Sequence, residues 1–191
     1  MSDRFRACLP PIAPGCDPQV RKSAQEQRAA ILVAALEQFG VSGLDATPID
    51  RIARRASVSA PYVHRLFGTK SELISAAIGE HTERLLNLLR SSRADRESDG
   101  SPLQALESTY FRLSEQDLGT LRRQLHVWGA AHDPALTATV QSSFESMWAE
   151  VGVSSGADPD EVRRFMAHAV LLTILASLDL MDLYGMEEKG C

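Results

Sequence analysis

Apolar residues recur every three to four positions along most of this chain, the spacing of one face of an α-helix. These stripes predict helices over residues 23–39, 71–90, 102–115, 118–131, 134–151 and 158–184. The segments between them are polar or contain glycine and proline. No apolar–polar alternation of a β-strand and no hairpin signal occurs in the sequence. The pattern therefore predicts an all-α protein.

The segment 47–70 predicts two short helices joined by a tight turn. Thr47 is a favourable residue to cap the first helix, and Ser59 to cap the second, which Gly68 ends. Apolar residues at positions 49, 52 and 53, and at 63, 66 and 67, give each helix an inner face. The outer face is basic, with Arg51, Arg54, Arg55, Arg65 and Lys70. This arrangement is typical of a helix-turn-helix that reads DNA.

The charge distribution supports this interpretation. The net charge is −5, which on its own disfavours a nucleic-acid partner. Residues 21–70, however, hold eight Lys/Arg and four Asp/Glu, net +4, whereas residues 71–191 hold ten and nineteen, net −9. Residues 1–20 hold two of each sign. A basic head on an acidic body directs positive potential toward phosphates at one end.

The segment from about 24 to 74 resembles the DNA-binding domain of the tetracycline-repressor (TetR) family of bacterial regulators. The matching positions are Phe39, Gly40, Gly43, Thr47, Ile49, Ile52, Ala53, Ala56, Val58, Ser59, Phe67, Lys70 and Leu73. Two positions depart from the family pattern. Ser57 replaces the turn glycine, and we expect it to adopt a left-handed conformation. His64 replaces the usual tyrosine, with Tyr62 two residues earlier.

The prolines and the glycine of residues 1–22 predict a flexible tail. The resemblance implies a helix-turn-helix DNA-binding domain over 23–70 and a regulatory and dimerisation domain over 71–191. Within the DNA-binding domain, the exposed start of the recognition helix is expected to reach base edges. Arg65 could contact a guanine or a phosphate. The other positions suit contacts to the DNA backbone, although a solvated basic face remains the alternative for each. The expected DNA-binding residues are Thr47, Ser59, Ala60, Pro61, Tyr62, His64, Arg65 and Lys70.

The basic residues just before the first helix, Arg21 and Lys22, could reach the minor groove or belong to a solvated tail. The three cysteines, Cys8, Cys16 and Cys191, lie in the two tails and match no metal motif. They are either inert thiols or take part in redox sensing, and the sequence leaves both roles open.

Aromatic and sulfur-containing residues in the acidic body either pack its core or line an apolar pocket with a few polar groups. In the TetR family, such a pocket lies among the long connecting helix and the helices after it. The resemblance thus implies a small apolar or amphipathic effector. The expected contacts are His81, Tyr110, His126, Trp128, Phe144 and Met147.

The last predicted helix is apolar nearly all round, so both of its sides must be covered. The resemblance implies a homodimer through the last two helices, which would form a four-helix bundle across a two-fold axis. Small residues would permit the close approach. The expected interface residues are Phe165, Ala169, Thr173 and Ala176.

The sequence gives no support for an enzyme, a metal site or a cofactor. The five histidines form no ligand pair at helical spacing, and no phosphate loop or nucleophile elbow is present. We also expect no membrane segment, and a cytoplasmic location, because the longest apolar run is too short to span a bilayer.

We therefore predict a homodimeric repressor that a small ligand releases from a near-palindromic operator. Two alternatives stay open. The first is a DNA-binding protein of the same fold that is controlled by a protein partner or by its abundance. The second is a helical enzyme or ligand carrier with a coincidental helix-turn-helix. A well-formed pocket would favour ligand control, and a catalytic pair would favour an enzyme.

Overall fold

The computed structural model describes residues 23–92 and 101–184, and every regular element in these ranges is helical. The expected tail over 1–22, with Arg21, Lys22, Cys8 and Cys16, lies outside the described residues, as does Cys191. In chain order the elements are α1 (Ala24–Ser42), α2 (Ile49–Arg55), α3 (Ala60–Phe67), α4 (Lys70–Ser92), α5 (Pro102–Gln116), α6 (Leu118–Gly129), the 3₁₀ turn η1 (Ala130–His132), α7 (Thr137–Ser155) and α8 (Pro159–Ser177). The prediction of an all-α fold is confirmed.

The helix starts follow the capping residues of the sequence. Ser23 and Glu26 form a capping box at the start of α1, and Asp158 and Glu161 form one at the start of α8. At α3 the Ser59 hydroxyl accepts a hydrogen bond from the Tyr62 amide at 3.3 Å. These side chains satisfy amides that the first helical turn leaves without a partner.

Several predicted boundaries are wrong: α1 continues past residue 39 to Ser42, and α7 past residue 151 to Ser155. Thr47 does not cap α2, because its hydroxyl instead donates to the Gly43 carbonyl at 2.7 Å. Asp133 does not start a long helix at position 134, since a 3₁₀ turn and a further turn precede Thr137. The last helix ends at Ser177, before position 184, and Asp179 follows in the left-handed region with φ 60°.

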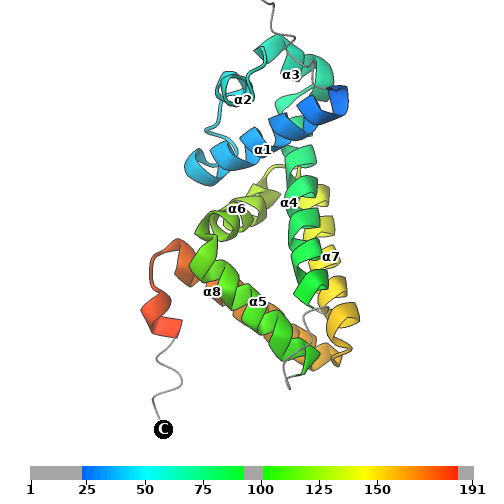
Figure 1. Cartoon of the computed structure of the whole chain (residues 1–191), viewed down its shortest axis with the longest axis vertical. Helices are drawn as coiled ribbons and strands as arrows, with labels where there is room; N and C mark the ends of the chain where they lie inside the picture. The colour runs from blue at the N-terminus through cyan, green and yellow to red at the C-terminus, as the bar shows by residue number, and fades with distance from the viewer. Residues whose placement is uncertain (1–22, 93–100, 185–191) are drawn as a thin grey trace, which may run out of the picture.

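The head consists of α1, α2, α3 and the first turns of α4 (Figure 1). Its core does not end at the expected domain boundary at residue 70. Apolar residues of α6, η1 and α7 join the same buried cluster, namely Val127, Ala130, Leu136 and Val140. The head therefore packs directly on the C-terminal end of α6 and the start of α7.

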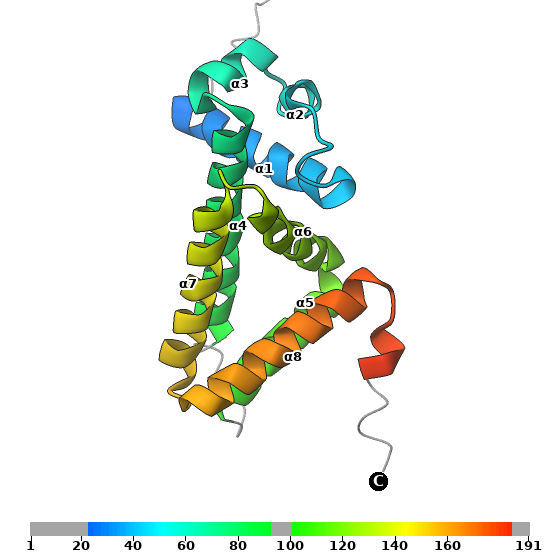
Figure 2. The same cartoon turned by 180° about the vertical axis from the view of Figure 1, so that it is seen from behind.

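The body has an open triangular outline in both views (Figures 1 and 2). α4 and α7 lie side by side along one edge, α5 and α8 along another, and α6 crosses below the head. A second buried cluster joins α4, α5, α6, α7 and α8, with Leu85, Leu106, Leu121, Met147 and Phe165 among its members.

The last two helices do not lie side by side as the expected bundle requires. α7 packs mainly along α4, whereas α8 packs on α5 and α6, so the two diverge from their connecting turn (Figure 2). The expected interface residues are also misplaced. Phe165, Ala169, Thr173 and Ala176 are all buried within their own chain. They face the inner side of α8, because this side covers Tyr110 and the second core.

Among the residues the structure describes, no helix has both the length and the apolar character that a membrane crossing requires.

Candidate functional site

The recognition helix α3 divides cleanly into an inner and an outer face. Val63 and Phe67 are buried, whereas Pro61, His64 and Arg65 are exposed and Ala60 is half-exposed. With only eight residues, α3 needs the packing of this inner face to hold it. The outer face, which carries most of the expected base-reading residues, is free to enter a groove.

Tyr62 lies at the edge between these faces and has two partners. Its hydroxyl donates to the Gln27 side chain of α1. The guanidinium carbon of Arg65 lies over its ring, 4.8 Å from the centroid, which is cation–π geometry. Arg65 thus has a defined starting position, while Tyr62 links the recognition helix to α1.

The turn between α2 and α3 has the predicted conformation. Ser57 has φ 57°, which is the left-handed region that an L-residue other than glycine occupies at a cost. Its neighbour Val58 donates its amide to the Ala53 carbonyl at 2.9 Å, closing the turn.

The residues expected to contact the DNA backbone differ in their surroundings. His64 is exposed, with Nδ1 3.1 Å from the Gly68 carbonyl. The Lys70 ammonium donates to the Asp45 carbonyl, and so ties the start of α4 to the loop before α2. Thr47 is completely buried, so its side chain faces the protein interior and not a phosphate. The prediction that the Thr47 side chain contacts the DNA backbone is therefore wrong.

The two most buried polar residues among the expected ligand contacts already have protein partners. The His81 Nε2 lies 2.9 Å from the Gln124 Oε1, and burial lowers the pKa of His81 to about 4. The Tyr110 hydroxyl lies 3.0 Å from that of Thr173, and burial raises the pKa of Tyr110 to about 12. Both groups are neutral at pH 7.

The remaining expected ligand residues are only partly brought together. Trp128 of α6 and Phe144 of α7 form an edge-on aromatic pair with centroids 6.2 Å apart. Met147 is buried in the second cluster. His126 faces Gly43 at the contact between α6 and the head. The six residues therefore do not line a single pocket.

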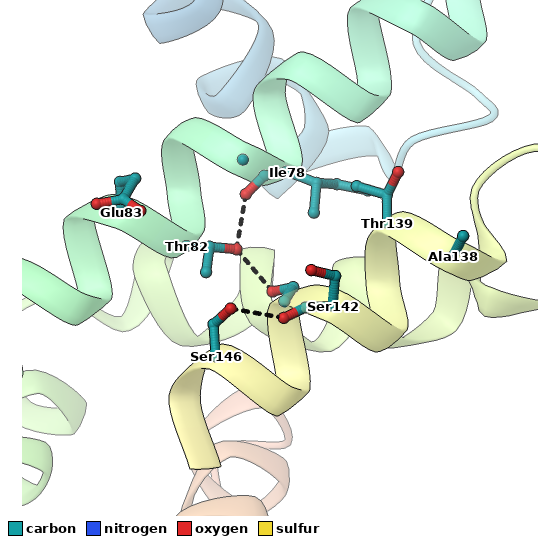
Figure 3. Close-up of a pocket in the computed structure, with 9 residues that line it drawn as sticks. Ile78, Thr82, Glu83, Ala138, Thr139, Ser142 and Ser146 are labelled. Carbon is teal, nitrogen blue, oxygen red and sulfur yellow. Dashed lines mark hydrogen bonds between the residues drawn. The ribbon is translucent and has the colours of Figure 1, made fainter. Parts of the chain in front are cut away.

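A groove of about 520 Å³ lies elsewhere, between α4 and α7 on the outside of the body (Figure 3). Small and hydroxylated side chains line it, among them Gly79, Thr82, Ser142 and Ser146. The hydroxyls of Thr82 and Ser143 lie 2.6 Å apart, and those of Ser75 and Thr139 2.8 Å apart. These polar contacts join α4 to α7 along their length.

Residues 31–77 match the sequence profile of the bacterial regulatory proteins of the tetR family. This segment contains α2, α3 and most of the recognition surface described above. This segment is a DNA-binding domain of the TetR family.

Curated relatives match mainly in this region. The HTH-type transcriptional activator FasR of Mycolicibacterium smegmatis is 32% identical over 97 residues, which are 51% of this chain and 44% of that protein. An HTH-type transcriptional repressor of Mycobacterium tuberculosis is 42% identical over 67 residues, which are 35% of this chain and 36% of that protein. The matches thus span less than half the length of these curated relatives.

Solved structures extend the likeness to the body of this chain. A transcriptional regulator from Streptomyces coelicolor A3(2) has a TM-score of 0.66 and 21% identity, over 80% of this chain and 87% of that one. A TetR transcriptional regulator from Legionella pneumophila has a TM-score of 0.65 and 18% identity, over 86% of this chain and 89% of that one. At these identities the likeness establishes the fold.

Sequence reasoning missed two glutamines of the TetR fold. Gln27 positions Tyr62, and Gln124 positions His81. Gln124 could have been found, because it lies on the apolar stripe of its helix between Leu121 and Trp128. Gln27 could not, since it stands among other polar residues near the start of α1.

Proposed function

We propose that this chain is a homodimeric transcriptional regulator that binds a near-palindromic DNA site through α3. One observation carries the proposal: α3 exposes Pro61, His64 and Arg65 on one face, while its opposite face is buried against the head. Because α3 follows a helix-turn-helix geometry, its exposed N-terminal residues suit the major groove. Ala60 and Pro61 can offer apolar contact, and Arg65 can donate to a guanine or a phosphate.

The dimer that we propose uses the outer side of α8 in place of its inner side. Three large apolar residues stand exposed there: Leu171 at 42%, Ile174 at 37% and Leu178 at 60%. With the exposed Ala167 they follow helical spacing and form one stripe, which we call the α8 outer stripe. A second copy placed on this stripe would remove it from water. Such a self-complementary contact is the usual geometry of a two-fold dimer.

A small-molecule effector would control DNA binding through two connections between body and head. The first is α4, which runs continuously from Lys70 beside the recognition helix to Ser92 in the body. The second is the junction of α6 and η1, where Val127 and Ala130 pack in the head's core. A ligand that shifts either element would change the position of α3. It can do so only if it binds the DNA-free conformation more tightly.

Regulation without an effector is the alternative, and the packing of Tyr110 and Met147 favours it. Both are buried, and the cavity beside Tyr110 holds only about 20 Å³, too little for a small-molecule effector. In that case a protein partner or the abundance of the regulator would set the occupancy of its site.

Selection from a random duplex library tests DNA binding directly. We expect the full chain to enrich a near-palindrome whose half-sites lie roughly 34–36 Å apart or somewhat more. Retention of duplexes without any enriched sequence would contradict the proposal. A reporter placed behind the enriched site then distinguishes repression, which we propose, from activation. Among the curated relatives one is named an activator and another a repressor, so both outcomes have a precedent.

A further inference from the structure

Two buried N–H groups on α6 lack a hydrogen-bond partner among the residues that the structure describes. They are the Gln124 Nε2 and the Trp128 Nε1, and water reaches neither atom. The two residues stand four positions apart, so they lie on the same face of α6. Buried donors are nearly always paired in folded proteins, because leaving one unpaired is destabilising. Two such donors within one helical turn indicate a place where a partner from outside the chain binds.

The Gln124 amide is oriented with its oxygen toward His81. His81 is neutral at pH 7, and its Nε2 lies 2.9 Å from the Gln124 Oε1. A neutral ring that carries its proton on Nε2 donates to this oxygen. The carboxamide nitrogen then points away from His81 with both of its hydrogens free. Gln124 is itself completely buried, so this arrangement belongs to the interior of the body.

Aromatic rings lead from these donors toward the surface. Trp128 packs edge-on against Phe144, and Phe144 lies 6.2 Å from Trp148 at an angle of 40° between the rings. Trp128 and Phe144 are half-buried, and Trp148 is 37% exposed. We call these three residues the aromatic row. An apolar ligand body would replace water over the row, and its polar end would reach the two donors once the side chains that cover them move aside, because neither nitrogen is accessible in this conformation.

The charges around the two donors indicate which polar group a ligand would carry. Both unpaired groups are donors, so they cannot pair with an ammonium group. Burial is the main cause of the low pKa of His81; among the charged groups, Arg123 and Arg84 lower it further and Asp117 opposes them, so two cations and one anion surround the ring. Positive charge near the site disfavours a cationic ligand and favours an oxygen acceptor.

We propose that Gln124 and Trp128 form the acceptor-binding end of an effector site, which takes an aromatic or similarly apolar molecule carrying a carbonyl or carboxylate oxygen. The ligand's oxygen accepts from the Gln124 Nε2 and the Trp128 Nε1, and its apolar body lies along the aromatic row. This inference rests on the proposed function only for its regulatory consequence, because binding itself does not require DNA.

Intrinsic fluorescence tests the site, since the two tryptophans of the chain, Trp128 and Trp148, both belong to the aromatic row. Three probes share a phenyl body: 4-phenylbutanoate, the neutral ketone 4-phenylbutan-2-one, and 4-phenylbutylamine. We expect both oxygen-bearing probes to change the tryptophan emission saturably, and the amine to bind at least tenfold more weakly. Equal affinity for the amine, or saturable binding of none of the three, would overturn the proposal.

Two tryptophan variants distinguish the contribution of the Trp128 N–H group to ligand affinity from that of aromatic packing. Trp128→Phe keeps a ring but removes the donor, and should weaken the oxygen-bearing probes about tenfold. Trp148→Phe is the comparison variant: the Trp148 nitrogen is not among the buried unpaired atoms, so this variant measures the loss of ring area alone and should weaken binding several-fold less than Trp128→Phe. Circular dichroism confirms that each variant folds. Equal effects of the two variants would show that the Trp128 N–H does not bind the ligand.

The same probes are then titrated against the protein bound to its selected duplex. If the probes bound saturably but did not release DNA, the acceptor site would be supported, and the proposal that it controls DNA binding would be contradicted. Specific DNA binding with no probe bound would contradict the site and leave the DNA-binding function intact.

Discussion

The guanidinium group of Arg65 lies over the ring of Tyr62, and the hydroxyl of Tyr62 donates to Gln27 on α1. The recognition helix therefore presents Arg65 from a platform that is anchored to a second helix. A side chain held in this way loses less conformational freedom when it meets DNA, which favours a defined contact. We therefore expect Tyr62 to act on DNA both directly, at the edge of α3, and through the position of Arg65.

This platform predicts different effects for two substitutions of Tyr62. Tyr62→Ala removes the ring under Arg65, and should relax base preference nearly as much as Arg65→Ala. We expect a loss of discrimination of about tenfold at one base position of each half-site, because a good side-chain contact to a base contributes about 1–3 kcal/mol. Tyr62→Phe keeps the ring and should retain most of the preference. Library selection with each variant measures this, and relaxed preference in Tyr62→Phe would mean that the hydroxyl is what matters.

Lys70 should contribute to affinity without contributing to sequence preference. Its ammonium lies beside the Asp45 carbonyl at the start of α4, where it adds positive charge to the head. Lys70→Ala should weaken binding to all duplexes alike and reduce the slope of log affinity against log salt by about 1. Titrations at several salt concentrations measure the slope.

Arg164→Ala provides the control, because Arg164 is an exposed cation on α8, outside the head. It should leave the slope unchanged. If Lys70→Ala altered neither the affinity for DNA nor the salt slope, the prediction that Lys70 contacts a phosphate would be wrong.

Much of the fold was predictable because each helix start carries its signal locally. Ser23, Ser59 and Asp158 are capping residues followed by an apolar stripe, and each caps a helix in the structure. Even the left-handed turn at Ser57 could be predicted, since the resemblance fixed the backbone geometry of that position.

The ends and faces of helices were less predictable because partners far along the chain decide them. The apolar pattern continues past Ser177 to Leu180, so nothing local marks the end of α8. α8 is also apolar nearly all round, so its sequence does not tell which side is inside. Thr173 is buried because the Tyr110 hydroxyl lies against it, 63 residues away in the chain.

The proposed dimer predicts that a charge on the α8 outer stripe separates the two copies. Ile174→Glu would place two like charges near the symmetry axis, and should give a protein of monomer mass. Ala169→Glu should instead unfold the chain, because Ala169 is buried within its own body. Light scattering and circular dichroism distinguish these outcomes.

Val153→Glu is the matched control for the stripe, since Val153 is apolar and 72% exposed but lies on α7. It should leave the dimer intact. If Ile174→Glu still had the mass of a dimer, the α8 outer stripe would not form the dimer interface.

Ser57→Gly should stabilise the protein. Ser57 has φ 57°, a conformation that costs an L-residue roughly 1 kcal/mol and that glycine adopts freely. Glycine also gains freedom in the unfolded chain, so we expect a net increase in the free energy of unfolding of a few tenths to 1 kcal/mol. Denaturant titration measures it. Ser57→Ala keeps the strain and should give no increase, so equal stabilisation by both variants would contradict a backbone origin.

His81 should make the stability of the protein depend on pH below neutrality. Burial lowers its pKa from 6.5 to about 4 in the folded state, so between these values the unfolded chain binds a proton that the folded chain does not. The free energy of unfolding therefore falls as pH falls from about 6.5 toward 4, and His81 contributes nothing to the slope above that window. The loss from this one group is on the order of 3 kcal/mol.

Substitution of His81 isolates this contribution, because other groups titrate in the same range. His81→Leu removes the titrating ring and leaves Gln124 without its partner, so the variant should be less stable at pH 7. Its stability should nevertheless fall less steeply between pH 6.5 and 4 than that of the parent. Denaturant titrations of both proteins at several pH values measure the difference in slope. Parallel curves would show that His81 takes up its proton in the folded protein as readily as in the unfolded chain, and that its burial against Gln124 does not hold it neutral.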